Sequence, residues 1–172
     1  MPLCDTALRL AQRGVYALRW SDRILQEAEK NLIELGRFDT EKIRRRFRVI
    51  REQFADAEVT GYMQLIDSMR CDRKDRHVLA AAVRASANQI VTSNLRDFPD
   101  ETVRPYDIEV VSPDAFLLNS LDAAPRTTYE VLREQIAALK RPVDVLATLA
   151  KAGAPEFAAA METVLAASQN DA

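Results

Sequence analysis

The sequence predicts an α/β protein: a three-layer α/β/α sandwich with a parallel sheet, followed by a helical C-terminal extension. Helical and strand-like stretches alternate along the earlier part of the chain, which is typical of parallel sheets with helices on both faces. After about residue 122 alanine becomes frequent and no further strand pattern occurs. The chain has only 4 glycines, which disfavours a turn-rich all-β architecture. We therefore expect a sandwich domain over residues 1–121 and a helical extension over residues 122–172.

The composition is that of a soluble globular protein. Of the 172 residues, 48% are hydrophobic and 29% are charged. The net charge is -2, so any contact with nucleic acid must come from a local patch. The two cysteines, Cys4 and Cys71, lack the spacing of a disulfide framework or a zinc site. No apolar run is long enough to span a membrane and no signal-peptide pattern is present, so we expect a cytoplasmic protein without a membrane partner.

The first part of the chain carries clear helix boundaries. Gly14 is a typical end for the first helix, Ser21 is a good N-cap for the second, and Asp39 or Thr40 can begin the third. Apolar residues recur at helical spacing in this third stretch, at Ile43, Phe47, Ile50 and Phe54. The patterns predict, in order, a helix over 3–13, a strand over 15–20, a helix over 21–35, a helix over 39–54 and a weak strand over 57–60.

The later part of the chain continues the alternation and then becomes helical. The patterns predict a helix over 75–87, strands over 89–92 and 108–111, and a helix that begins at Pro113 and runs through Leu118. Proline is tolerated in the first turn of a helix, where its missing N–H would have no partner. The spacing of Pro125, Pro142 and Pro155 therefore predicts about three further helices.

Acidic and amide side chains occur at the positions where a predicted strand ends and a helix or loop begins. Sites in open parallel sheets form at the carboxyl ends of the strands, so these side chains are expected to converge. Clustered carboxylates repel one another unless a hard cation such as Mg²⁺ or Mn²⁺ lies between them, and such an ion can activate water against a phosphate. Each residue also has a local interpretation as a helix cap, a turn residue or a solvated side chain. The candidates are Glu27, Asp72, Asp75, Asn94 and Asp97.

Three ordered motifs carry a resemblance to a known family. They are Ser21-x-x-Ile24-Leu25-x-Glu27, Asp72-x-x-Asp75-Arg76-His77-Val78-Leu79, and Ile90-Val91-Thr92-x-Asn94-x-x-Asp97-Phe98-Pro99. Together they resemble the successive motifs of PIN domains, the nuclease domains of VapC-type toxins, over about residues 3–121. The resemblance implies a parallel α/β/α sandwich and a Mg²⁺- or Mn²⁺-dependent ribonuclease.

The resemblance also implies roles for individual residues. Glu27, Asp75 and Asp97 would bind the metal, and Asp72 would support them from outside. Asn94 stands where many members have another Asp, and it would orient water or ligand without adding charge. The C-terminal helices would bind an antitoxin protein or a second copy of the chain.

The beginning of the sequence departs from the PIN pattern. PIN domains begin with a buried strand that ends in Asp, whereas here Met1-Pro2-Leu3 leads directly into a helix. Asp5 lies inside that helix and does not replace the missing residue. We expect either that the true start lies upstream or that this is a shortened member. In the second case Mn²⁺ binding and nuclease activity should be weak.

A run of six cations lies on the helix predicted over residues 39–54. The cations are Lys42, Arg44, Arg45, Arg46, Arg48 and Arg51, mostly away from its apolar face. The run is either a solvated helix face or a clamp for the RNA backbone, and Arg44, Arg45 and Arg48 are the candidate RNA-binding residues. His77 is the lone histidine and is more typical of a packed or helix-surface residue than of a catalytic base.

The sequence therefore predicts a metal-dependent endoribonuclease that acts on RNA. Two alternatives remain open. The first is a catalytically impaired PIN fold that serves as an interaction module, which the absent Asp and the neutral Asn94 favour. The second is a different α/β protein, such as a phosphotransfer or regulatory domain, in which the acids are only caps.

Overall fold

The computed structural model describes residues 2–138 and 144–170, and the chain forms two compact units. The helical unit comprises Met1–Ala17, Val91–Asn94 and Val111–Ala172. The mixed unit comprises Leu18–Ile90 and Leu95–Val110. The predicted boundary after residue 121 stays a prediction.

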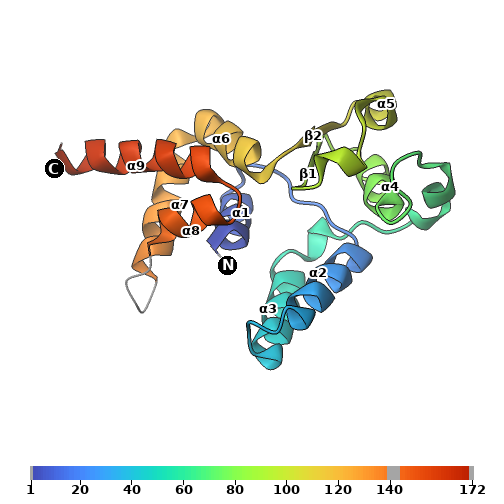
Figure 1. Ribbon diagram of the computed structural model, residues 1–172, viewed down its shortest axis with the longest axis horizontal. Coiled ribbons are helices and arrows are strands. Elements are labelled where there is room, and N and C mark those ends of the chain that lie inside the picture. The colour runs from blue at the N-terminus through green and yellow to red at the C-terminus, as the bar shows by residue number, and fades with distance from the viewer. Residues whose placement is uncertain (1, 139–143, 171–172) are drawn as a thin grey trace. The chain divides into compact units, whose positions relative to one another are not determined.

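The helical unit contains the two ends of the chain. Its helices are α1 (Pro2–Gln12), α6 (Pro113–Ala123), α7 (Pro125–Ala137), α8 (Val145–Lys151) and α9 (Pro155–Asn170) (Figure 1). They enclose an apolar core in which Leu10, Leu132, Leu149, Phe157 and Met161 have no exposed surface. The helical C-terminal region is thus confirmed. Two of the three prolines begin helices as predicted, α7 and α9, whereas Pro142 lies outside the described residues.

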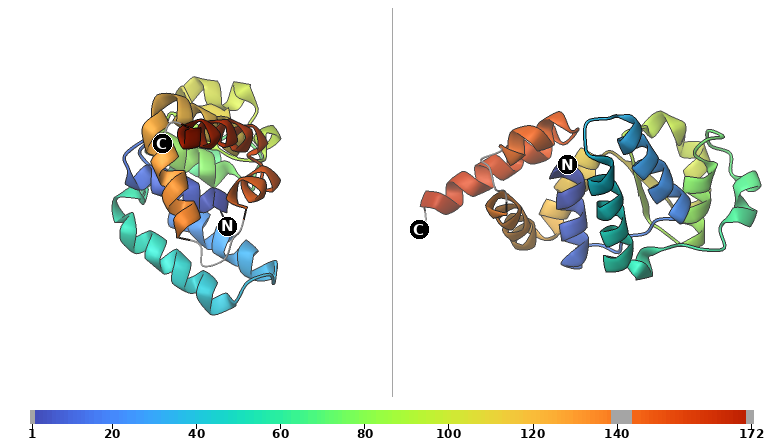
Figure 2. Two further views of the ribbon diagram at one scale, coloured as in Figure 1. Left: turned by 90° about the vertical axis from the view of Figure 1, so that its left-hand side faces the viewer. Right: turned by 90° about the horizontal axis from the view of Figure 1, so that it is seen from below.

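The mixed unit contains α2 (Asp22–Glu34), α3 (Thr40–Gln53), α4 (Arg76–Arg84) and the short α5 (Asp100–Val103). Helices α2 and α3 lie side by side as an antiparallel pair (Figures 1 and 2). Both begin at the predicted caps: the N–H of Ile24 donates to Ser21 Oγ at 3.4 Å, and the N–H of Lys42 donates to Asp39 Oδ1 at 2.9 Å. Short 3-10 helices over Ala55–Ala57, Met63–Ser68, Leu95–Asp97 and Arg104–Tyr106 connect the elements.

The two later strands are present and form a parallel pair. Strand β1 (Gln89–Val91) lies beside β2 (Glu109–Val111). The N–H of Glu109 donates to the Asn88 carbonyl at 2.9 Å, and the N–H of Thr92 donates to the Val111 carbonyl at 3.0 Å. The α/β class is confirmed, whereas the described part of the chain has a sheet of two strands. The full three-layer sandwich therefore stays a prediction.

The strand predicted over residues 15–20 is wrong. The N–H of Val15 donates to the Leu10 carbonyl and so closes the end of α1, and the Tyr16 hydroxyl donates to the Ala7 carbonyl at 2.7 Å. The Tyr16 ring also packs edge-on against Phe116. These contacts hold Val15 and Tyr16 against helices, and of the predicted strand only Trp20 forms a β-type pairing.

The weak strand predicted over residues 57–60 is reduced to a single contact. Trp20 and Glu58 form an isolated parallel bridge, in which the N–H of Trp20 donates to the Ala57 carbonyl and the N–H of Val59 donates to the Trp20 carbonyl. Trp20 is buried, at 6% exposure. The bridge fixes the start of α2 against the segment that follows α3.

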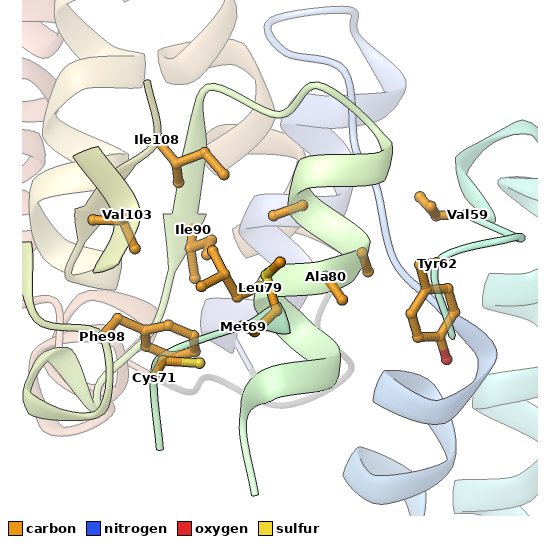
Figure 3. Close-up of a cluster of buried hydrophobic side chains, with 12 residues drawn as sticks. Val59, Tyr62, Met69, Cys71, Leu79, Ala80, Ile90, Phe98, Val103 and Ile108 are labelled. Carbon is orange, nitrogen blue, oxygen red and sulfur yellow. The ribbon is translucent and has the colours of Figure 1, made fainter. Parts of the chain in front are cut away.

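The core of the mixed unit lies around α4. Leu79 and Ala80 of α4 are fully buried and face an apolar cluster that includes Ile90 of β1, Met69 and Phe98 (Figure 3). Because α4 is held along its apolar side, its first turn and the residues before it are held in place as well. No helix in the described ranges combines the length and apolar character that crossing a membrane requires.

Candidate functional site

The segment before α4 and the turn after β1 are joined by their backbones. The N–H of Asp72 donates to the Asp97 carbonyl at 3.2 Å. Asp72 also shapes the turn itself, since its Oδ1 accepts from the N–H of Lys74 at 3.0 Å and its carbonyl accepts from the N–H of Asp75 at 2.9 Å. The fold therefore brings three of the predicted residues, Asp72, Asp75 and Asp97, into one small region.

Asp75 occupies the N-cap position of α4, but its side chain caps nothing. An N-cap residue normally has an extended backbone, which lets its side chain reach the amides of the first turn. Asp75 instead has φ −102° and ψ 0°, and its Oδ2 is buried without a hydrogen-bond partner among the described residues. The capping interpretation of Asp75 therefore has no hydrogen bond to support it.

The surroundings of Asp75 disfavour its charge. Burial is the main cause that raises the pKa of the Asp75 carboxyl above its usual value. The Lys74 ammonium opposes this shift, and the Asp97 carboxylate adds to it. Asp75 and Asp97 are each 22% exposed and lie on either side of the Lys74 ammonium, so two like charges are close together here with limited access to water.

Lys74 bridges the two carboxylates. Its Nζ lies 3.0 Å from Asp97 Oδ2 and 3.9 Å from Asp75 Oδ2. The hydrogen bond and the charge of Asp97 raise the pKa of Lys74, so this side chain carries its positive charge at neutral pH. Lys74 was not among the candidate residues predicted from the sequence. Its position between Asp72 and Asp75, two candidate acids of one motif, was the signal that could have indicated it.

Glu27 forms a second contact nearby, with His77. Its Oε2 lies 3.1 Å from His77 Nε2, and its Oε1 accepts from Arg23 Nε at 3.0 Å. His77 is 1% exposed, so it is packed, one of the two predicted situations. Its Nδ1 lies 2.9 Å from the Lys74 carbonyl, while the contact to Glu27 lacks hydrogen-bond geometry. Both ring nitrogens therefore lie near oxygen atoms, Nδ1 near the Lys74 carbonyl and Nε2 near the Glu27 carboxylate.

Asn94 is part of the helical unit and is exposed. Its N–H donates to Thr92 Oγ1 at 3.1 Å, which closes a short turn after β1. The described contacts thus fall into two groups in the mixed unit, Asp75 and Asp97 around Lys74, and Glu27 with His77. The backbone of residues 74–77 links the two groups.

The donor chemistry at Asp75 and Asp97 fits a divalent ion, but only two carboxylates converge. Within residues 2–138 and 144–170, no group of three or more His, Cys, Asp or Glu side chains is arranged to hold a metal. Mg²⁺ nevertheless binds commonly through one or two carboxylates and keeps several waters. A buried Asp75 oxygen without a hydrogen-bond partner, beside a cation already held by both carboxylates, is consistent with such a site.

Helix α3 presents its cations to solvent. Ile43, Phe47 and Ile50 form its buried face, so Arg44, Arg45 and Arg48 are exposed on the other sides. Arg44 pairs with Glu41 at 2.8 Å, whereas Arg45 and Arg48 form no ion pair within the described part of the chain. Two of the three candidate RNA-binding residues are therefore without an acidic partner there.

Comparison with known proteins identifies the family. A PIN domain model matches residues 2–96, more than half of the chain. This chain belongs to the PIN domain family. The match covers α1 to α4 and β1 and ends at residue 96, just before Asp97, and it confirms the resemblance to PIN domains. A model of the VapC50 C-terminal domain matches residues 113–163, which carry α6, α7, α8 and part of α9.

A relative of this PIN domain protein is named as a ribonuclease. It is named "Putative ribonuclease VapC50" and comes from Mycobacterium tuberculosis. It is 48% identical over 82 residues, which are 48% of this chain and 48% of the relative, so the match spans about half of the relative's length. No solved structure matches this chain.

Proposed function

We propose that this PIN domain protein is a VapC-type endoribonuclease that hydrolyses RNA phosphodiester bonds with the help of Mg²⁺ or Mn²⁺. The observation that carries the proposal is the convergence of Asp75 and Asp97 on one cation, with an Asp75 oxygen left without a hydrogen-bond partner. Family membership and the relative's name support the same reaction class.

Each acidic residue has a distinct role in the proposal. Asp75 and Asp97 hold the ion, and Glu27 serves as a third carboxylate at the edge of the site. The ion supplies charge that polarises a phosphate oxygen and favours deprotonation of the attacking water. Asp72 holds the turn through its bonds to the backbone of Lys74 and Asp75. Asn94 belongs to the other unit, and the role that the PIN resemblance implies for it, orienting water or ligand, stays a prediction.

Buried His77 keeps Glu27 beside α4 in this scheme. Glu27 lies on the exposed side of α2, where a carboxylate would otherwise be free to turn into solvent. The imidazole of His77 is fixed by packing and by the Lys74 carbonyl, so it offers Glu27 a rigid partner.

The basic face of α3 binds the RNA backbone in the proposal. Arg44, Arg45 and Arg48 are exposed, and phosphate binding by such side chains releases counterions from the nucleic acid. The helices of residues 122–172 would bind an antitoxin protein or a second copy of the chain. An RNA substrate and such a partner are consistent with a cytoplasmic protein.

A second candidate function is an interaction module without catalysis. Two observations favour it: no three-ligand group exists within the described ranges, and Glu27 contacts His77 and Arg23. Its partner would bind without any dependence on divalent ions.

Cleavage of a fluorogenic RNA during a Mn²⁺ titration tests the proposal. The wild-type chain should cleave in proportion to ion occupancy. Asp75→Asn should lower the rate at least about 100-fold, since a metal supplies several kcal/mol of transition-state stabilisation. Asp67→Asn is the matched control, because Asp67 is an exposed acid of the same unit and loses the same charge. Equal rates for Asp75→Asn and the wild type would overturn the assignment, and cleavage by neither would favour the interaction module.

A further inference from the structure

The Lys74 ammonium lies where the proposed function requires a divalent ion. Its Nζ contacts Asp97 Oδ2 at 3.0 Å and reaches Asp75 Oδ2 at 3.9 Å, and these are the two carboxylates assigned to the metal. One cation between two anions relieves the repulsion that a metal would otherwise relieve. A divalent ion that binds Asp75 and Asp97 would therefore compete with the Lys74 ammonium for the same position.

We propose that Lys74 is a tethered cation that occupies the divalent-ion position at Asp75 and Asp97 and must leave when Mg²⁺ or Mn²⁺ binds. This inference rests on the proposed function, since it concerns the same site. Lys74 lowers the affinity of the site for divalent ions and keeps the carboxylates paired in their absence.

The backbone of Lys74 is fixed, so the ammonium cannot drift far from the carboxylates. The Lys74 N–H donates to Asp72 Oδ1 at 3.0 Å, and the Lys74 carbonyl lies 2.9 Å from His77 Nδ1. His77 is buried at 1% exposure and anchors this carbonyl to the first turn of α4. A side chain held at its base acts at a high local concentration, which is what a competing cation requires.

The ammonium itself remains displaceable. The Lys74 side chain is 64% exposed, whereas the side chains of Asp75 and Asp97 are each 22% exposed. Exposed ion pairs contribute little to stability, so a divalent ion can replace the lysine without disturbing the fold. The Lys74 side chain can move into solvent because its stem is not packed inside the protein.

Isothermal titration with MnCl₂ at constant ionic strength tests the inference without any need for RNA cleavage. Lys74→Met should bind Mn²⁺ about fivefold more tightly than the wild type, which corresponds to the upper end of what an exposed ion pair contributes. Lys74→Arg keeps the charge and should bind as the wild type does. Arg73→Met is the matched control, because it removes the same charge from the neighbouring exposed residue and should change the affinity less than about twofold.

The outcomes separate this inference from the proposed function. Equal affinities for Lys74→Met and Arg73→Met would overturn the role of Lys74. The metal site would still stand in that case if Asp75→Asn abolished binding. If neither the wild type nor Lys74→Met bound Mn²⁺, the metal site and the tethered cation would both be overturned.

Discussion

Helices α3 and α4 both follow an aspartate and both bury an apolar face, yet they use the aspartate differently. Asp39 has an extended backbone, and its Oδ1 accepts from the N–H of Lys42 at 2.9 Å, so it caps α3. Asp75 has a backbone close to the helical region, and its carboxylate caps nothing. An aspartate at the N-cap position therefore caps α3, whereas in α4 its carboxylate is available to another partner.

The two helices also differ in which charged side chains gather beside them. Arg45 and Arg48 extend from α3 without an acidic partner in the described ranges, whereas Asp75 and Asp97 converge before α4. Arginine side chains attract phosphates, whereas carboxylates attract divalent metal ions. In the proposed enzyme, α3 therefore binds the RNA backbone and the start of α4 holds the ion that acts on it.

Of the substitutions that distinguish α3 from α4, those of the α3 cations are expected to have the largest effect, on RNA binding. Replacing Arg44, Arg45 and Arg48 together with Gln should weaken RNA binding about tenfold or more at low salt, because three phosphate contacts are lost. The slope of log affinity against log salt should flatten by roughly 0.7–0.9 for each lost contact. A fluorescence titration of labelled RNA at several salt concentrations measures both quantities.

A variant with the same charge change elsewhere controls for net charge. Lys30, Arg126 and Lys151 are exposed cations outside α3, and replacing them together with Gln removes three positive charges. This variant should bind RNA with nearly the wild-type salt slope. If the two variants had the same slope, α3 would be an ordinary solvated face.

A smaller effect is expected for the caps themselves. Asp39→Ala should lower the free energy of unfolding by about 1 kcal/mol, since it removes the acceptor for an amide of the first turn of α3. Asp75→Ala should not lower it, because no cap bond is lost and the repulsion with Asp97 is relieved. Urea unfolding of both variants measures the difference. A loss for Asp75→Ala as large as that for Asp39→Ala would restore the capping interpretation.

The smallest effect is the pH dependence of the Asp75 contribution. Burial and the nearby Asp97 raise the pKa of Asp75 in the folded chain above its unfolded value, with Lys74 opposing them. Between the two pKa values the folded state binds more protons, so this group lowers stability as the pH rises through the folded pKa. The stability of Asp75→Asn relative to the wild type should therefore be greater at pH 7 than at pH 4. Thermal melting in the absence of divalent ions checks this, and the opposite trend would contradict the raised pKa.

Local signals predicted the helices well, because caps act within a few residues. Ser21 and Asp39 begin α2 and α3 as the sequence indicated. The predicted strand over 15–20 was wrong because Tyr16 packs against Phe116, which is distant along the chain. The residues of a β-type run do not indicate which distant residue they will contact in the folded chain.

The sequence could indicate candidate site residues but not the contacts that they make. The motifs indicated Glu27, Asp75 and Asp97 as metal ligands, and this assignment stays a prediction. The pairings of Lys74 with Asp97 and of His77 with Glu27 join segments that only the fold brings together. Periodicity and capping rules describe one element at a time, so they do not predict which cation meets which carboxylate.

The most direct test of the account is the effect of Mn²⁺ on thermal stability in two matched variants. Asp75→Asn and Asp39→Asn each exchange a carboxylate for an amide at the start of a helix, and Asn remains a good N-cap. At a Mn²⁺ concentration 100 times the dissociation constant, the ion should stabilise the wild type and Asp39→Asn by about 2.7 kcal/mol and should leave Asp75→Asn unchanged. Equal stabilisation of all three proteins, or of none, would contradict the claim that the carboxylate before α4 holds a divalent ion.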